Sequence, residues 1–382
     1  MMRPLPLPIP EPPAWRLDWG ALDERFDWVR AMRGCPQDPA YHGEGDVLVH
    51  VRMVCEALAG MEAWRELPAT ERKILFAAAL VHDVAKPSCT RHEDGRITSR
   101  GHSPRGAIDG RRILWDLGAD FAVREQVCAL VRYHQTPFHL IERADAQRRA
   151  FLISQTARCD LLAMLARADA LGRQCSDQSS ILEHVALFEE FCREQECLLT
   201  PRRFPSARSR FLYFRSEDRD PDYLAYDDSR CEVTLLSGLP GSGKDTWIAR
   251  HLNSVPVVSL DAIRGTLGAA PTGEQGAILQ AAREEARTLL RQASDFAWNA
   301  TNLSRDIRRQ LVDLLTGYSA RIRIVYVEAE PAKLFQQNRN RDAAVIVFGI
   351  PEAKTSDRAP SAVSVLRPRL ERPKKGSTLT IY

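Results

Sequence analysis

The sequence predicts a two-domain protein, α + α/β, with an all-helical N-terminal part and a C-terminal part built on a parallel sheet. Residues 31–199 carry apolar residues at helical spacing and few strand-like runs. Residues 231–345 instead alternate short apolar runs with helical stretches, which is typical of a parallel sheet covered by helices. At 382 residues the chain is long enough for each domain to bury its own core.

The segments outside these two domains lack a regular period. Residues 1–30 begin MMRPLPLPIPEPP, which indicates a proline-rich arm and not a signal peptide, because it contains no apolar core. Residues 200–230 mix prolines, charges and aromatic residues, which is typical of a linker. Residues 346–382 end in the basic run RPRLERPKKGSTLTIY, and we expect a poorly ordered tail.

Composition narrows the class of protein. No apolar stretch approaches the ~20 residues that span a bilayer, so no membrane association is expected. The nine cysteines include no CxxC pair; Cys192 and Cys197 are the closest, and nothing nearby in the sequence completes a zinc site. This usage indicates reduced thiols in a cytoplasmic protein. The net charge of +3 is too small to indicate nucleic acid by itself.

Three predicted helices of the N-terminal domain each place a titratable residue on an apolar face. His50 lies on the apolar face of DVLVHVRMVCEAL, and Asp169 on that of DLLAMLARADALG. In TERKILFAAALVHDVAKP we expect Thr70 to be the N-cap, with His82 facing inward and Asp83 following it. Because a buried carboxylate is unfavourable without a positive partner, convergence on divalent cations would satisfy these groups together.

Each of these residues also has a simpler interpretation. A single inward histidine is more often a hydrogen-bonded core residue than a ligand, and Asp169 could pair with Arg167 or Arg173. The order His, His-Asp, Asp on three separate helices favours the metal site.

This order resembles the signature of the HD phosphohydrolase superfamily. The segments YHGEGDVLVH, AALVHDVAKP and GHSPRGA are similar to the branch found in CCA-adding enzymes. The resemblance implies two ions of a divalent transition metal (Mn, Co, Ni, Fe or Zn) and six ligands: His50, His82, Asp83, His102, His134 and Asp169. Asp83 would bridge the two ions, and His139 in RYHQTPFH is the rival of His134.

The neighbouring polar residues have less definite roles. Lys86 is placed to contact a phosphate oxygen as a positive charge, and a plain surface lysine is the alternative. His42 and His92 are expected to be polar loop residues. We expect this domain to remove phosphate from a 2′ or 3′ end, or to open a 2′,3′-cyclic phosphate.

A phosphate-binding loop is indicated at GLPGSGKDT, which follows the apolar strand EVTLLS and begins a helix. It predicts binding of ATP, or another nucleoside triphosphate, with Mg²⁺, through Gly238, Gly241, Ser242, Gly243, Lys244, Asp245 and Thr246. Asp245 stands where Ser or Thr usually contacts magnesium. Two alternatives follow: Asp245 contacts magnesium through water, or Thr246 supplies the hydroxyl.

Further polar residues follow the predicted strands. Asp261 follows VPVVSL, which we expect to lie next to the phosphate-loop strand, where a general base would face the γ-phosphate. A helix N-cap is the alternative role for Asp261. Asn299 stands where many such enzymes carry an acid. Arg339 and Arg341 form either a lid over the triphosphate or part of a solvated face.

The segments GLPGSGKDTW, SLDAIR and WNATN together resemble the polynucleotide 5′-kinase family. The resemblance implies that Lys244 binds phosphate, that Asp261 is the general base for a 5′-OH, and that Arg264 contacts the phosphate of the acceptor end. It makes Arg339 and Arg341 the lid candidates. Residues 30–345 as a whole look like the bacterial HD–polynucleotide kinase enzymes, although no ordered segment is evident after the lid.

These resemblances imply an enzyme that heals broken ends of RNA or DNA. One domain would clear the 2′ or 3′ phosphate and the other would phosphorylate the 5′-OH, giving ends for a ligase acting downstream. Two other classes are open: a metabolite or nucleoside kinase fused to an HD nucleotide phosphohydrolase, and a nucleotide-sensing regulatory protein.

Overall fold

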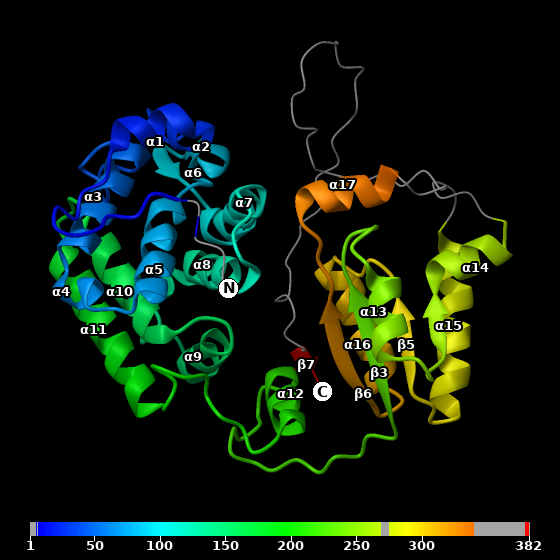
Figure 1. Ribbon diagram of the computed structural model, residues 1–382. Coiled ribbons are helices and arrows are strands. Elements are labelled where there is room, and N and C mark those ends of the chain that lie inside the picture. The colour runs from blue at the N-terminus through cyan, green and yellow to red at the C-terminus, as the bar shows by residue number, and fades with distance from the viewer. Residues whose placement is uncertain (1–4, 6, 269–274, 340–378, 382) are drawn as a thin grey trace. The chain divides into compact units, whose positions relative to one another are not determined.

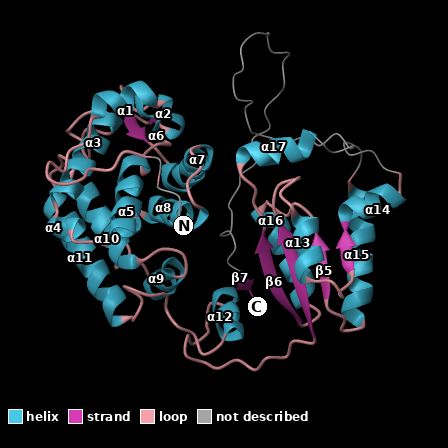
Figure 2. Ribbon diagram, in the orientation of Figure 1, coloured by secondary structure: helices cyan, strands magenta, loops and turns pink. Residues whose placement is uncertain are grey.

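The structure is a computed structural model that describes residues 5, 7–268, 275–339 and 379–381. The chain divides into two compact units, Met1–Arg203 and Phe204–Tyr382. The first is helical and the second contains a five-stranded sheet with helices, which confirms the predicted fold class (Figures 1 and 2). No helix in the described part of the chain combines the length and the hydropathy that a membrane span requires.

The helical unit is built from short and medium helices. In chain order they are α1 Trp19–Arg25, α2 Asp27–Arg30, α3 Val47–Gly60, α4 Glu62–Arg65, α5 Ala69–Val81, α6 Lys86–Cys89, α7 His102–Asp116, α8 Phe121–Tyr133, the 3₁₀ turn η1 Thr136–Phe138, α9 Ala146–Ser154, α10 Cys159–Leu171 and α11 Gln178–Glu194. Helix α5 is central, because every residue from Ile74 to Val81 is buried. It packs against α3, α8 and α10 (Figure 1).

The helix starts follow local capping chemistry. Asp46 caps α3, since its carboxylate accepts a hydrogen bond from the Val49 amide at 2.9 Å. Helix α5 begins at Ala69 after Pro68, so Thr70 lies inside its first turn and is not the N-cap that the sequence suggested. Helices α1 and α2 lie within the proline-rich arm of residues 1–30. They are ordered there because apolar side chains such as Leu22, 1% exposed, pack into the unit.

A small hairpin precedes α7. Strands β1 Arg91–Glu93 and β2 Arg96–Thr98 pair antiparallel around Asp94 and Gly95, whose φ angles are 51° and 75°. Asp-Gly is a strong signal for such a two-residue turn, although the sequence analysis did not use it. The hairpin returns the chain to α7, whose first residue is His102.

The second unit begins with α12 Ala207–Arg215, which lies inside the stretch treated as a linker from sequence. Its further elements are β3 Cys231–Ser237, α13 Lys244–His251, β4 Val257–Ser259, α14 Leu260–Thr266, α15 Gly276–Arg291, β5 Phe296–Asn299, α16 Arg305–Thr316, β6 Ala320–Tyr326, α17 Pro331–Arg339 and β7 Leu379–Ile381. The sheet order is β4-β5-β3-β6-β7, with the first four strands parallel and β7 antiparallel to β6.

The strand order corrects one expectation from sequence. Strand β4, which precedes Asp261, pairs with β5 and not with the phosphate-loop strand β3. After β3 the chain passes to the edge of the sheet and returns to insert β5 between the two. Asn299, at the end of β5, is therefore the residue beside Leu236 of β3 in the pairing register.

The C-terminal segment is only partly described. Strand β7 extends the sheet next to β6, and the sequence analysis did not anticipate a strand there. The rest of the predicted tail, residues 346–378 and 382, lies outside the described residues.

Candidate functional site

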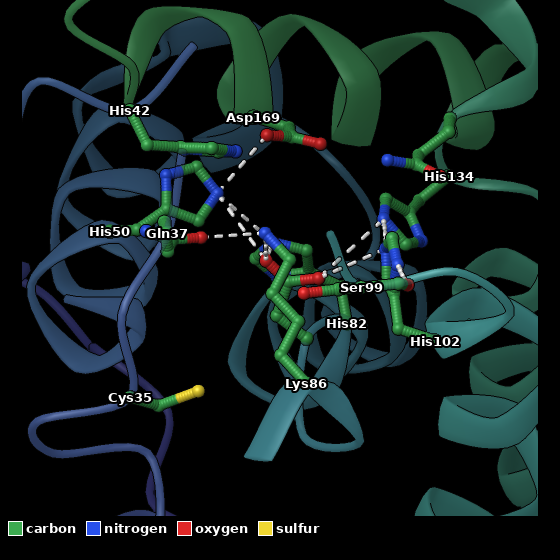
Figure 3. A network of polar contacts seen from close by, with 12 residues as sticks. Cys35, Gln37, His42, His50, His82, Lys86, Ser99, His102, His134 and Asp169 are labelled. Atoms are coloured by element: carbon green, nitrogen blue, oxygen red, sulfur yellow. Dashed lines mark hydrogen bonds and ion pairs between the residues drawn. The ribbon is translucent and has the colours of Figure 1, made fainter. Parts of the chain in front are cut away.

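The six predicted metal ligands come together inside the helical unit, and all but Asp83 are labelled in Figure 3. Helix α3 supplies His50, α10 supplies Asp169, and His102 is the first residue of α7. The others lie directly after helix ends: His82 and Asp83 after α5, and His134 after α8. All six are buried, with His102 the most exposed at 6%.

Asp83 is the centre of the group. Its Oδ2 atom lies 3.3 Å from His82 Nε2 and 3.7 Å from His50 Nε2, and its Oδ1 atom lies 3.3 Å from His102 Nε2 and 3.8 Å from His134 Nε2. The two oxygens of one carboxylate thus face two separate pairs of imidazoles. This arrangement places Asp83 where a ligand shared by two cations would stand.

Backbone carbonyls orient three of the histidines. The Nδ1 atom of each lies close to the carbonyl oxygen three residues earlier: 2.7 Å for His82, 2.7 Å for His102 and 2.8 Å for His134. With Nδ1–H donating to the carbonyl, Nε2 carries the lone pair. All three Nε2 atoms face Asp83, so the tautomers suit metal binding.

Glu44 orients the fourth histidine and was not considered in the sequence analysis. Its Oε1 atom lies 2.8 Å from Nδ1 of both His50 and His42, and its Oε2 atom accepts the Gln174 amide at 2.9 Å. Burial would raise the pKa of Glu44, but the two imidazoles hold it below its usual range. His42 is thus a half-buried neighbour of the site, its pKa lowered to about 4 mainly by burial. His92 is exposed on β1.

Two buried, positively charged side chains balance the carboxylates of Asp83 and Asp169. Lys86 Nζ lies 2.7 Å from Asp83 Oδ2 and donates to Gln37 Oε1 at 2.6 Å. At 5% exposure it is not the surface lysine that was the alternative. Arg173 donates to both oxygens of Asp169, at 2.9 and 3.0 Å.

The same cations keep these carboxylates ionised. Burial alone would raise the pKa of Asp83, yet Lys86 and His82 hold it well below its usual range. Arg173 and His50 do the same for the pKa of Asp169 against its burial. Asp169 Oδ1 also lies 3.2 Å from His50 Nε2. Asp169 therefore pairs with Arg173 and at the same time lies among the candidate metal ligands.

The donor chemistry fits divalent cations. Asp83 Oδ1 is buried and has no hydrogen-bond partner among the described residues. Burial and the nearby His82 lower the pKa of His134 to about 3, so its imidazole is neutral, and its Nε2 lies 3.4 Å from His102 Nε2. Lone pairs and an unpaired carboxylate oxygen facing one another are unfavourable unless a cation lies between them.

His134, and not its rival, belongs to this cluster. Asp83, His102 and His134 offer ligand atoms within 4.8 Å of one another, as do His50, His82 and Asp83. His139 is exposed, and its ring packs against Phe138.

In the second unit, the predicted phosphate-binding loop joins β3 to α13. Gly238 needs to be glycine, because its φ is 159° and a Cβ would overlap the carbonyl oxygen of Val327. Gly241 and Gly243 also have positive φ, 75° and 93°. Lys244, the first residue of α13, directs its Nζ back to the loop carbonyl of Gly238 at 3.1 Å. The loop therefore has the close turn and helix N-terminus that suit phosphate.

The two unusual residues of this loop region are partners. Asn299 Nδ2 donates to Asp245 Oδ1 at 2.7 Å, and Asn299 is only 8% exposed. P-loop enzymes commonly pair a hydroxyl on the helix with an acid at the end of the neighbouring strand. Here the acid is on the helix and the hydrogen-bond donor is on the strand. Thr246 is exposed. The loop region therefore still has one carboxylate, which Asp245 of α13 supplies in place of a residue at the end of β5.

Asp261 lies in the first turn of α14 but does not cap it. Ser259 is the N-cap and accepts from the Ala262 amide at 3.3 Å, which excludes the alternative role for Asp261. The Asp261 side chain is 74% exposed and pairs with Arg264, which also donates to Gln275 Oε1 at 3.0 Å.

The lid candidates are described only in part. Arg339 is the exposed last residue of α17, and Arg341 lies outside the described residues. The residue before Arg339, Asn338, donates to the carbonyl of Pro240 in the phosphate loop at 3.0 Å. Helix α17 therefore contacts the loop, through a residue that the sequence analysis did not single out.

Comparison with known proteins matches both units. Residues 47–173 match the HD domain family, and residues 233–356 match the AAA domain family described as AAA_33. A chain in a solved structure titled "Structure of Pnkp1/Rnl/Hen1 complex" overlays with a TM-score of 0.28 and 20% identity, over 36% of this chain and 47% of that chain.

Several curated relatives share the name "Multifunctional CCA protein". The relative from Halorhodospira halophila is 32% identical over 123 residues, 32% of this chain and 27% of the relative. The relative from Acidovorax sp. (strain JS42) is 31% identical over 158 residues, which are 41% of this chain and 34% of the relative. The relative from Cupriavidus metallidurans is 34% identical over 163 residues, which are 40% of this chain and 36% of the relative. The chain thus spans about a third of these relatives' length. Together the matches show that it joins an HD domain to a P-loop domain of the AAA_33 type.

Proposed function

We propose that the chain heals nucleic-acid ends. Its HD domain would remove a 2′ or 3′ phosphate, or open a 2′,3′-cyclic phosphate, and its P-loop domain would transfer a phosphoryl group from ATP to a 5′-OH. The two domain matches support an enzyme with phosphohydrolase and nucleotide-kinase chemistry. The observation that carries the first activity is the position of Asp83 between two pairs of imidazoles.

The residues around Asp83 would bind and orient a phosphate ester. His50, His82, Asp83 and Asp169 would hold one divalent cation, and Asp83 would share a second with His102 and His134. Bound there, two such cations supply a polarised phosphorus and hydroxide near neutral pH. Lys86, buried against Asp83 and Gln37, adds a fixed positive charge that would face a phosphate oxygen.

The P-loop domain would carry the second activity. Lys244 and the loop amides would bind the β- and γ-phosphates of ATP, and Asp245, held by Asn299, would face the magnesium ion through water. Asp261 would accept the proton of the 5′-OH as that oxygen bonds to the γ-phosphorus and ADP leaves. Its exposure suits an acceptor as large as a polynucleotide end.

The remaining roles follow from this chemistry. Arg264 would contact the phosphate of the acceptor end, with Arg339 and Arg341 closing over the triphosphate. The products, a 3′-OH and a 5′-phosphate, are the ends that a nucleic-acid ligase joins. The nine free cysteines agree with a reducing cytoplasmic compartment.

One substrate tests both activities. An oligonucleotide with a 5′-OH and a 3′-phosphate is incubated with ATP and a panel of divalent ions, and both ends are analysed. We expect 3′-phosphate release that is lost in the double variant His82→Ala, Asp83→Ala, and 5′ phosphorylation that is lost in Lys244→Ala. Comparing RNA and DNA versions of the oligonucleotide shows which nucleic acid the protein prefers.

Two outcomes would contradict the proposal. Undiminished phosphate release by the double variant would remove the HD centre as the phosphatase. Faster phosphorylation of free nucleosides than of the oligonucleotide would favour a metabolite kinase.

A further inference from the structure

A second set of metal-ligating side chains lies elsewhere in the helical unit. The thiols of Cys159, Cys192 and Cys197 are within 4.8 Å of one another, and their residues are 0%, 0% and 1% exposed. Cys159 is ten residues before Asp169 on the same helix, about 15 Å along it, so this cluster is separate from the Asp83 centre. Cys159 is distant from Cys192 and Cys197 in the chain, so their spacing alone indicated no partner.

A defined helix end places two of these thiols together. Helix α11 ends at Glu194, and Glu196 has a left-handed φ of 52°. The Cys197 amide donates to the Cys192 carbonyl at 2.8 Å, and the Glu196 amide donates to the Arg193 carbonyl at 3.0 Å. This pair of bonds is the Schellman motif, which brings the side chains at the positions of Cys192 and Cys197 into contact.

A separate backbone contact brings in the third thiol. Cys159 is the first residue of α10, and the amide of the next residue, Asp160, donates to the Leu198 carbonyl at 3.1 Å. The start of α10 is thereby tied to the residue that follows Cys197. The three sulfurs are held by backbone geometry and not by flexible side chains alone.

Positive charge lies beside this cluster. Arg202 pairs with Glu196, the residue before Cys197, at 3.2 Å. The first turn of α10 adds the positive end of a helix dipole beside Cys159.

We propose that Cys159, Cys192 and Cys197 bind one thiophilic cation, zinc or monovalent copper, which fastens the start of α10 to the end of α11. Soft thiolates select these ions over the harder cations that carboxylates prefer. The three sulfurs lie within 4.8 Å of one another, close enough for one such ion to contact all of them.

Cadmium tests the site in the full-length chain, because thiolate-to-cadmium charge transfer absorbs in the ultraviolet whereas imidazole and carboxylate ligands give no such band. Reduced, metal-free protein is titrated with Cd²⁺ without oxygen. We expect a band that saturates with one thiolate-bound cadmium per chain. It should be largely lost in Cys159→Ser and Cys192→Ser. Zinc and copper contents of the protein as isolated then tell which ion it carries.

Two controls separate this site from other thiols and from the HD centre. Cys128→Ser removes a buried cysteine of α8 outside the cluster and should keep the full band. His82→Ala should keep it as well, since it alters only the Asp83 centre. If a serine variant fails to fold, the thermal midpoint of the double variant His82→Ala, Asp83→Ala is measured with and without Cd²⁺ instead. A rise is expected, and an unchanged midpoint overturns the proposal. Absence of the band in the wild-type protein, or an unchanged band in both serine variants, overturns the proposal.

Discussion

The charge of Asp83 can be removed with little change of shape. Replacing it with asparagine keeps the volume but leaves two pairs of imidazoles without their shared carboxylate. We expect Asp83→Asn to lower 3′-phosphate release by at least about 100-fold and to lower bound metal, because changes outside the ligand shell already cost about 10- to 100-fold. Phosphate release and metal content measure this. Asp109→Asn, on α7, is the matched control and should have no such effect.

Glu44 gives a milder test of the same centre. It supports Nδ1 of His50 from outside the ligand set, at 2.8 Å. We expect Glu44→Gln to weaken metal binding by about 10- to 100-fold, the range usual for groups that orient a ligand. Competition with a chelator measures the affinity. Glu56→Gln, exposed on α3, should leave it unchanged; equal affinities for all three proteins would show that Glu44 only fills space.

Single residues were predictable to the extent that motifs carry them. The His, His-Asp, Asp order singled out His50, His82, Asp83 and Asp169, and the structure places them together. Glu44 was missed although its partners His42 and His50 are close to it in the chain. It stands before α3, where no helical period indicates the direction of its side chain.

Among the elements, the turn after β3 has the strictest backbone requirement. Gly238→Ala would push a Cβ into the Val327 carbonyl, which is main chain and cannot swing aside. We expect a loss of roughly 1–3 kcal/mol in the stability of this unit and loss of ATP binding. Denaturant unfolding and nucleotide titration measure the two effects. Gly276→Ala, at the open start of α15, is the control and should bind ATP normally.

The start of α14 carries the proposed base of the kinase reaction. Ser259 caps this helix, so removing the Asp261 carboxylate should leave the element folded. We expect Asp261→Ala to reduce phosphoryl transfer to a 5′-OH oligonucleotide by about 100- to 10,000-fold while ATP still binds. Transfer assays and nucleotide titration separate the two steps. Transfer at the wild-type rate would exclude Asp261 as the base.

The elements were easier to predict than their order. Alternating apolar runs and helices identified β3, β4, β5 and β6, because the period is local. The insertion of β5 between β3 and β4 was missed, because the sequence of a strand does not indicate which other strand it pairs with. Strand β7 was missed for a similar reason, since it depends on pairing with β6.

For the whole molecule, the division at Arg203 predicts that ligands act on one unit at a time. We expect calorimetry to show two transitions. Removing divalent metal with a chelator should lower the transition temperature of the helical unit only. ATP with magnesium should raise the transition temperature of the second unit only. At a hundred times its dissociation constant, ATP should stabilise that unit by about 2.7 kcal/mol. Lys244→Ala should abolish the response to ATP. His82→Ala should diminish the response to the chelator, to which the thiol cluster also contributes. A single transition that responds to both ligands would contradict this independence.

The charges around Asp83 have a consequence for how the substrate is attracted. Asp83 and Asp169 bring two negative charges, and Lys86 and Arg173 bring two positive ones in direct contact with them, so the four cancel. Every divalent ion that enters adds positive potential that these four side chains do not neutralise, and the neighbouring Glu44 offsets part of it. An anionic ester should therefore bind more tightly once metal is present and, by thermodynamic reciprocity, should raise the affinity of the centre for the metal by the same factor.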